Sequence, residues 1–431
     1  MPSTVRFGTD GIRGRAYQEI TPTLAYRLGR AVARVLASPV VVGYDTRESS
    51  PVLAAALLAG LVDGGVEATN LGVFTTPGVA VTAQRRGSCG VVVSASHNPY
   101  FDNGLKVLGP GGGKLDVATE RALERALHDT PAPTSEEFPD VAIDESAEAE
   151  YVAHLRRLVP VDLSGLHVVL DCANGASSHV AHELFCATGA RVTTLHDRPD
   201  GVNINNDCGS THPESLARTV IDLGADLGLA FDGDADRLIA VDATGTLRDG
   251  DDVMILFAAE TSRPDRGLVV TTMSNLGLHR AMESVGVHVV ETEVGDRNVL
   301  LELEERGWVL GGEQSGHIIF RDLSPTGDGL LTGLKVAALV AQRGPLHELC
   351  NERWERLPQR LVNVAADVYD DASVRSLFEQ VRDRHGVAES DVRLFIRRSG
   401  TEPLVRVMFE ATSAALVEEF TFSLRELFDL A

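Results

Sequence analysis

The chain has 431 residues, and at roughly 150 residues per domain this length indicates about three domains, or four. Its 62 acidic and 39 basic residues give a formal net charge of −23, while 44% of the residues are hydrophobic, which is typical of a folded protein rather than a disordered one. The acidity argues against a general nucleic-acid binder and against electrostatic attachment to anionic lipid. It also disfavours an anionic ligand, unless a local cluster of cations overrides the overall field.

The sequence lacks the features typical of membrane-spanning, secreted, disulfide-rich or zinc-binding proteins. No apolar run reaches the ~18 residues of a membrane span, and residues 1–10 lack the basic-then-apolar pattern of a signal peptide. The 5 cysteines are scattered and in no CxxC spacing, which argues against a disulfide framework or a zinc site. We therefore expect a cytoplasmic protein.

Short β-branched runs alternate with helical stretches along most of the chain. The alternation predicts an α/β protein with largely parallel or mixed sheets. The predicted strands and helices of this part are strands at 40–42, 90–93, 167–170, 268–270 and 287–290, and helices at 53–62, 180–188, 214–223 and 298–306.

The same rhythm recurs three times, which suggests three related α/β units, and the last segment differs. Its pattern of a strand at 361–364, a helix at 373–385, two further strands at 392–401 and 404–409 and a final amphipathic helix predicts a small α+β domain. Polar or Pro-bearing stretches mark the seams between units. We therefore predict domains at 1–155, 156–252, 253–358 and 359–431.

A serine-rich turn, Ser94-Ala95-Ser96-His97-Asn98-Pro99, directly follows the strand that ends at Val93. A serine at the end of such a strand lies in the crevice where open α/β sheets bind ligands. A capped turn is the plain alternative. The glycines of a hydrolase nucleophile elbow are absent, and Pro99 excludes a Ser-x-x-Lys motif. A hydroxyl that accepts and returns a phosphoryl group therefore stays open, with Lys106 as a nearby cation.

Three carboxylates alternate in a second loop, at Asp232, Asp234 and Asp236, after an apolar strand. Carboxylates so close together repel one another and usually need a divalent cation. An EF-hand does not fit, because Arg237 stands where glycine is required and Ala243 where glutamate is required. We predict a Mg²⁺ site that bridges to a phosphate, with Arg237 beside it; a solvated acidic loop is the alternative.

Two further loops carry polar groups suited to a sugar phosphate. Glu313, Ser315 and His317 alternate after a strand, so in an extended loop they would point the same way and could read sugar hydroxyls. In the second loop, backbone amides of a Ser-Gly-Thr turn beside an arginine would form an anion site. A turn with a surface histidine and a plain hairpin are the respective alternatives. The residues of this predicted anion site are Arg397, Ser399, Gly400 and Thr401, with Arg406 on the following strand.

Taken together, the four loops resemble those of the α-D-phosphohexomutase superfamily, and the resemblance runs along essentially the whole chain. Residues 7–14, Phe-Gly-Thr-Asp-Gly-Ile-Arg-Gly, look like the N-terminal motif of the family. The resemblance is greatest to the bacterial branch that acts on glucosamine phosphates. The residues that carry this closer likeness are 94–99, 201–205, 294–297, 312–317 and 397–403.

The resemblance implies a fold and a role for each loop. The fold would be three similar mixed-sheet α/β domains plus a C-terminal α+β domain like the TATA-binding protein, arranged around a central cleft. In chain order they would carry the phosphoserine, metal-binding, sugar-binding and phosphate-binding loops. Ser96 would carry the phosphoryl group and, with Asp232, Asp234 and Asp236, bind one Mg²⁺ per chain. The other implied roles are Arg13, Lys106 and His317 at the transfer site; Arg237 on the moving phosphate; Gly295, Asp296, Glu313 and Ser315 on the sugar; and Arg397, Ser399, Gly400, Thr401 and Arg406 on the distant phosphate.

The activity implied is interconversion of glucosamine 6-phosphate and glucosamine 1-phosphate through a 1,6-bisphosphate. Interconversion of glucose or mannose phosphates is the nearest alternative. A non-catalytic, metal-dependent sugar-phosphate binding protein is the alternative from another class. The family also implies a homodimer, and neither nucleic acid nor membrane is expected as a partner.

Overall fold

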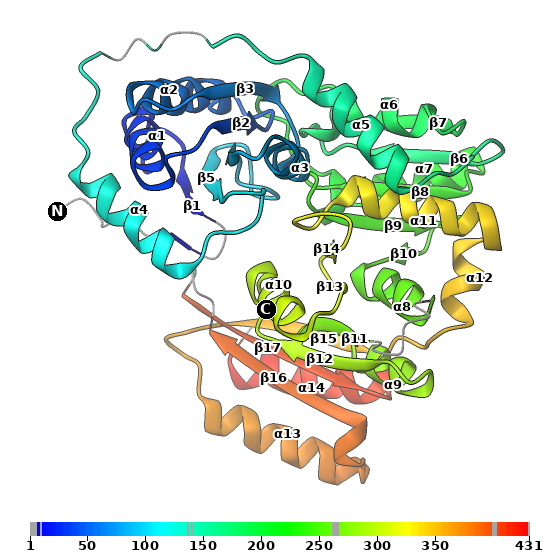
Figure 1. Ribbon diagram of the computed structural model, residues 1–431. Helices are drawn as coiled ribbons and strands as arrows, with labels where there is room; N and C mark the ends of the chain where they lie inside the picture. Colours follow the sequence, from blue (N-terminus) through cyan, green and yellow to red (C-terminus); the bar gives the residue numbers. More distant parts are fainter. Residues whose placement is uncertain are drawn as a thin grey trace.

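The structure is a computed structural model that describes residues 7–8, 11–135, 138, 141–260, 267–398 and 403–429. Within these residues, four β-sheets follow one another along the chain, each accompanied by helices (Figure 1). The predicted α/β class with a smaller C-terminal sheet is therefore confirmed. No helix among the described residues combines the length and apolar character needed to cross a bilayer.

The first sheet has the strand order β1-β5-β4-β2-β3, in which β4, β2 and β3 are parallel and β5 is antiparallel to both β4 and β1. Val40 and Val42 of β2 belong to the core under α1 and α2, whereas Val41 belongs to the core under α3. The strand is thus buried on both faces, as its continuous apolar run predicts. The elements are β1 Ile12–Arg15, α1 Pro22–Leu36, β2 Val40–Tyr44, α2 Ser50–Asp63, β3 Ala68–Val73, α3 Thr76–Arg86, β4 Cys89–Val93, β5 Asp102–Leu108 and α4 Val117–Asp129.

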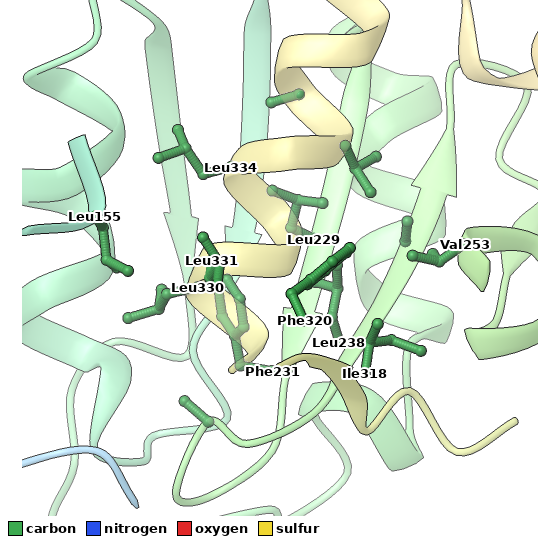
Figure 2. Packing of buried hydrophobic residues seen from close by; sticks show 14 of the residues in the cluster. Leu155, Leu229, Phe231, Leu238, Val253, Ile318, Phe320, Leu330, Leu331 and Leu334 are labelled. Atoms are coloured by element: carbon green, nitrogen blue, oxygen red, sulfur yellow. The ribbon is translucent and has the colours of Figure 1, made fainter. Parts of the chain in front are cut away.

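The second sheet has the order β10-β9-β8-β6-β7, in which β8, β6 and β7 are parallel and β9 is antiparallel to both β8 and β10. Helix α11 covers it although it follows the third sheet in the sequence: Leu331 and Leu334 of α11 lie among Leu229, Phe231 and Leu238 (Figure 2). The third unit therefore contributes to the core of the second. The elements are α5 Ser146–Leu158, β6 His167–Asp171, α6 Ser177–Cys186, β7 Arg191–Leu195, η1 Gly209–Thr211, α7 Glu214–Leu223, β8 Leu227–Phe231, β9 Leu238–Asp242, β10 Leu247–Arg248 and α11 Gly329–Arg343.

The third sheet has the order β12-β11-β13-β14, and the fourth is an antiparallel sheet of order β15-β17-β16. Helices α13 and α14 accompany the fourth sheet at the end of the molecule far from α2 (Figure 1). The elements are α8 Gly250–Glu260, β11 Gly267–Thr271, α9 Leu276–Ser284, β12 His288–Thr292, α10 Asp296–Arg306, β13 Leu310–Gly312, β14 Ile318–Phe320, α12 Leu346–Asn351, β15 Gln359–Ala365, α13 Asp371–His385, η2 Glu389–Asp391, β16 Val392–Arg398, β17 Leu404–Ala411 and α14 Ala414–Leu427.

The hydrophobic cores divide unequally among the units. One cluster runs without a break from α3 of the first unit through the second sheet to Leu268 and Val270 of the third. The fourth unit has a separate core, which includes Val364, Val407 and Phe420. The first three units are therefore joined by shared apolar packing, whereas the fourth packs its own apolar residues internally.

Candidate active site

The serine loop and the aspartate loop meet between the first and second sheets. Ser96 follows β4 and Asp232 follows β8, so each lies at the carboxyl end of an inner strand. Ser96 Oγ donates a hydrogen bond to Asp232 Oδ2 at 2.6 Å, across 136 positions of sequence. Both residues are 1% exposed. The two loops that the sequence singled out separately thus form one buried site.

The three aspartates form a group that could hold a metal ion. One carboxylate oxygen from each of Asp232, Asp234 and Asp236 lies within 4.8 Å of the others. Among the described residues, Asp234 Oδ1 and Asp236 Oδ1 are buried and have no hydrogen-bond partner. Burial, and then repulsion from Asp236 and Asp234, raises the pKa of Asp232 well above its usual range. Buried carboxylates with unsatisfied oxygens fit a hard divalent cation.

Cations surround the aspartates on several sides. Lys106 Nζ lies 2.7 Å from Asp234 Oδ2 and 3.7 Å from Asp236 Oδ2. The Nε of Arg237 lies 3.9 Å from Asp236 Oδ1. Burial by itself would raise the pKa of Asp236, but Lys106, His317 and Arg237 together lower it below its usual range. These cations therefore favour the ionised form of Asp236.

His317 is a buried cation at the same site. Its Nδ1 lies 3.6 Å from Asp236 Oδ2, and its Nε2 lies 3.9 Å from Asp296 Oδ2. Burial disfavours the charged imidazole, but the interaction with Asp236 outweighs it and raises the pKa of His317 to about 9. His317 is thus protonated at neutral pH and can donate a proton or attract a phosphate.

Arg13 adds a further cation to the site, and a neutral histidine, His97, lies beside the serine. Arg13 of β1 pairs in register with Gly104 of β5, two residues before Lys106. His97 Nδ1 lies 3.3 Å from Ser96 Oγ. Burial, and then the positive charges of Arg237 and Arg13, lowers the pKa of His97 to about 3. His97 is therefore neutral beside the serine. It belongs to the serine turn seen in the sequence, but the sequence assigns it no role of its own.

The loop of Glu313 lies beside these cations but differs from the sequence expectation. It is a tight turn between β13 and β14, closed by a bond from the Gly316 amide to the Glu313 carbonyl, and not an extended segment. Glu313 and His317 are consequently buried while Ser315 is exposed. Glu313 Oε1 accepts a hydrogen bond from the Gly295 amide at 3.0 Å, so the expected sugar-binding residues Gly295 and Glu313 do come together.

Asp296, which lies near His317, also forms an ion pair with the first unit. Its Oδ2 lies 2.5 Å from Lys114 Nζ, and the next residue, Arg297, pairs with Glu120 at 2.8 Å. Lys114 lies in a glycine-rich segment to which the sequence assigned no role. Its pairing with Asp296 can be seen only once the first and third units are placed side by side.

The expected phosphate-binding loop is described only in part. Ser399, Gly400 and Thr401 lie outside the described residues. Arg397 of β16 and Arg406 of β17 lie directly opposite one another in the antiparallel pair. Like charges at facing positions destabilise a sheet unless an anion or a counter-charge offsets them, which is compatible with the predicted anion site.

Comparisons with known proteins agree with this architecture. Models of the phosphoglucomutase/phosphomannomutase family match in four parts: domain I at residues 4–133, domain II at 149–245, domain III at 249–357 and the C-terminal domain at 359–426. A protein of Pelotomaculum thermopropionicum named phosphoglucosamine mutase is 47% identical, over 96% of this chain and 97% of its own. A protein of Desulforamulus reducens with the same name is 45% identical, over 98% of both chains.

A solved structure is also similar over nearly the whole chain. It is a phosphoglucomutase/phosphomannomutase family protein from Burkholderia thailandensis, with a TM-score of 0.81 and 26% sequence identity, covering 99% of this chain and 97% of that one. All four family domains are matched in order, and they span more than half of the chain. The chain therefore belongs to the phosphoglucomutase/phosphomannomutase family, within the α-D-phosphohexomutase superfamily.

Proposed function

We propose that the chain interconverts glucosamine 6-phosphate and glucosamine 1-phosphate, through a phosphoserine at Ser96 and a 1,6-bisphosphate intermediate. The observation that carries this activity is the 2.6 Å hydrogen bond from Ser96 Oγ to Asp232, one of three grouped carboxylates. A hydroxyl beside a metal-binding group can accept and return a phosphoryl group. The names of the Pelotomaculum and Desulforamulus relatives favour glucosamine phosphates as the substrates.

One Mg²⁺ per chain is the cation we propose for Asp232, Asp234 and Asp236, together with an oxygen of phosphorylated Ser96. The unsatisfied oxygens of Asp234 and Asp236 are ligands of the hard type that Mg²⁺ prefers. When bound, Mg²⁺ would neutralise the charge of the phosphoryl group during transfer. Phosphorylation of Ser96 is the modification that this activity requires.

The chemistry is a transfer from Ser96 to the sugar and back. O1 of glucosamine 6-phosphate attacks the phosphorus, the new O–P bond forms as the bond to Ser96 Oγ breaks, and the sugar hydroxyl gives its proton to a base. Ser96 Oγ regains a proton from an acid. Lys106 and His317 are the groups proposed for these proton transfers, with Arg13 and Arg237 stabilising the charge in flight. Ser96 then takes the phosphate from O6 by the reverse steps.

The remaining residues are proposed to hold the sugar in either orientation. The bisphosphate intermediate must reorient in the site between the two transfers, so that its other phosphate faces Ser96. A second phosphate site away from Ser96 is therefore required. The proposed ligands are Gly295, Asp296, Glu313 and Ser315 for the ring, and Arg397, Ser399, Gly400, Thr401 and Arg406 for the non-reacting phosphate.

Phosphoglucomutase/phosphomannomutase activity is the second candidate, and the description of the matching family models favours it. The two are separated by measuring kcat/KM with glucosamine 6-phosphate, glucose 1-phosphate and mannose 1-phosphate under the same conditions. We expect the largest kcat/KM for glucosamine 6-phosphate. A larger value for glucose 1-phosphate or mannose 1-phosphate would overturn the choice of substrate but not the phosphoserine chemistry.

We further propose a cytoplasmic protein that binds neither nucleic acid nor membrane and that forms a homodimer. The masses of the free protein and of any assembly are directly measurable by light scattering after size exclusion. A monomer at micromolar concentration would contradict the dimer without affecting the proposed activity.

A further inference from the structure

A fully buried arginine lies behind the serine loop, outside the residues considered so far. Arg47 follows β2 and is 0% exposed. Its Nη2 donates to the carbonyl oxygens of Ser96, at 2.9 Å, and Asn98, at 2.8 Å. Its Nη1 donates to the carbonyl oxygens of Asp102, at 3.0 Å, and Pro99. The arginine therefore holds both ends of the turn that carries Ser96.

Asp45 completes this network with its carboxylate. It accepts a hydrogen bond from Arg47 Nε at 2.8 Å, which occupies the fifth donor of the guanidinium. It also accepts from the Ser94 hydroxyl at 2.6 Å, and that hydroxyl accepts from the Ser96 amide at 2.9 Å. Backbone groups on both sides of Ser96 are thus tied to a single buried ion pair.

The backbone of Ser96 needs this support. Its φ is +54°, in the left-handed region that serine rarely adopts. A residue persists in such a conformation only where its surroundings over-determine it. The aspartate loop also packs closely against this turn: a Cβ added at Gly233 would lie 2.6 Å from the Ser96 carbonyl oxygen, so only glycine fits there.

Asn205 reaches the same carbonyls from the second unit. Its Nδ2 donates to Ser96 O at 2.9 Å and to Asn98 O at 3.2 Å. Asn205 itself has a φ of +57° and is anchored by a bond from its amide to the Ala173 carbonyl. The carbonyls of Ser96 and Asn98 therefore each accept hydrogen bonds from Arg47 of the first unit and from Asn205 of the second.

We infer that Arg47 and Asn205 are positioning residues for phosphoryl transfer, an inference that rests on the proposed function of Ser96. They fix Ser96 Oγ where it meets Asp232 and, when phosphorylated, where the phosphorus faces the sugar hydroxyl. Transfer depends on alignment of the attacking oxygen with the phosphorus, and a misplacement of about 1 Å costs roughly 100-fold in rate. Neither side chain needs to touch the substrate for this effect.

The first test replaces Arg47 with methionine. The Arg47→Met variant removes the donors while keeping a long side chain, and Arg248→Met is its matched control, because Arg248 is also largely buried and paired with an aspartate, at 2.8 Å. We expect kcat of Arg47→Met to fall roughly 100-fold with KM nearly unchanged, and Arg248→Met to keep the wild-type kcat. Equal losses in both variants, or a loss expressed in KM alone, would overturn the inference.

The second test uses asparagines that both have positive φ. Asn205→Gly removes the amide without straining the backbone, and Asn174→Gly does the same at a φ of +48° where the side chain bonds to Asn203 and not to the serine turn. We expect kcat to fall roughly tenfold, and only in Asn205→Gly. The Arg47→Met and Asn205→Gly losses should be non-additive, because both residues hold the same carbonyls. A wild-type kcat in Asn205→Gly would contradict the inference even if Arg47→Met did not fold.

Hydrogen exchange separates this inference from the proposed function, because it needs no turnover. Exchange of the amides at residues 96–104 should quicken in Arg47→Met and Asn205→Gly but not in the two controls. An inactive wild-type enzyme would refute the proposed function. An active wild-type enzyme whose variants show neither faster exchange in this turn nor a lower kcat would refute the positioning role alone.

Discussion

The transfer site around Ser96 and the junction of the fourth unit with the third are both built from charged side chains, but they differ in burial. Lys106 and Asp234 pair at 2.7 Å with side chains 4% and 0% exposed. At the junction, Arg280 and Asp391 pair at 2.6 Å with side chains 40% and 39% exposed. Buried pairs are costly to break, whereas exposed pairs contribute little to stability.

The difference separates two tasks. Around Ser96 the groups are fixed, because phosphoryl transfer requires constant geometry. The fourth unit has a core of its own, and its contacts with the third include the ion pair of Arg393 with Glu291 at 3.0 Å and a hydrogen bond from the Leu276 amide to the buried Glu410 at 2.8 Å. We therefore expect this unit to change its position at low cost, so that its arginines can follow the phosphate that is not reacting.

The largest effect is expected at Ser96 itself. Ser96→Ala removes the oxygen that forms the covalent link, so turnover with glucosamine 6-phosphate should be abolished while the fold is retained. Ser178→Ala is a suitable control, since Ser178 is also buried and its hydroxyl donates to a local carbonyl, that of Gly175. Steady-state assays measure both, and near-wild-type turnover in Ser96→Ala would contradict the role of Ser96.

The next largest effect is expected at Asp234. Asp234→Ala removes one carboxylate of the metal-binding group and the partner of Lys106, so the Mg²⁺-dependent rate should fall roughly 100-fold or more. Chelation of Mg²⁺ should abolish the wild-type rate, and added Mg²⁺ should restore it. A rate in Asp234→Ala that is unchanged at every Mg²⁺ concentration would argue against metal binding by this loop.

A smaller, KM-based effect is expected in the fourth unit. Arg397→Met should raise KM roughly tenfold and change kcat less, because each charged hydrogen bond contributes about 1.5–3 kcal/mol. Arg398→Met is the matched control: the adjacent side chain is exposed and points to the other face of β16. If kcat fell in Arg397→Met as far as in Asp234→Ala, the contrast between the two regions would be lost.

A change in stability with pH is expected from Asp328, whose side chain is buried. Burial raises its pKa to about 6, from a usual value of 3.8. The folded protein therefore binds the proton more tightly than the unfolded chain, and stability falls as pH rises from about 4 to 6. Ionisation of this group then costs ~3 kcal/mol above pH 6.

The Asp328 side chain caps the start of α11 by accepting a hydrogen bond from the Leu331 amide. Asp328→Asn removes the charge and keeps an oxygen that can accept this bond. We expect the free energy of unfolding to rise by about 1–3 kcal/mol at pH 7.5 and to change little at pH 4. Urea titrations at the two pH values measure the difference. Destabilisation at pH 7.5 would show that the charged form is favoured.

The smallest effect is expected at the junction. Arg280→Gln breaks a half-exposed ion pair, and it should change the free energy of unfolding by less than about 1 kcal/mol and leave kcat close to that of the wild type. Thermal unfolding and steady-state kinetics measure the two quantities. A loss of kcat comparable to that of Asp234→Ala would mean that the junction is part of the fixed geometry.

Much of this organisation can be predicted from the sequence, because it is local. Apolar runs such as 40–42 and 167–170 predict buried strands, and Ser96 and Asp232 directly follow strands, where ligand sites form. The packing of α11 on the second sheet is not local: its sequence neighbours belong to the third unit. Sequence alone could not reveal it.

The role of Arg47 could not be predicted for the same reason. Its guanidinium bonds to the carbonyl of Ser96, which lies 49 positions away in the sequence. Arginine is also mostly an exposed residue. Asn205 and Lys114 likewise find their partners only across units. The alternating polar residues at 313–317 predict an extended loop, because such alternation is typical of strands. The structure has a turn there instead, which Gly316, with a φ of +92°, permits.

The most direct test of the central claim is the mass of the intact protein after incubation with glucosamine 1,6-bisphosphate and Mg²⁺. We predict the addition of one phosphoryl group, which peptide mapping places on Ser96 and which excess glucosamine 6-phosphate removes. The Ser96→Ala variant should gain no mass. A wild-type mass that never increases, or a phosphoryl group on another residue, would contradict the phosphoserine mechanism.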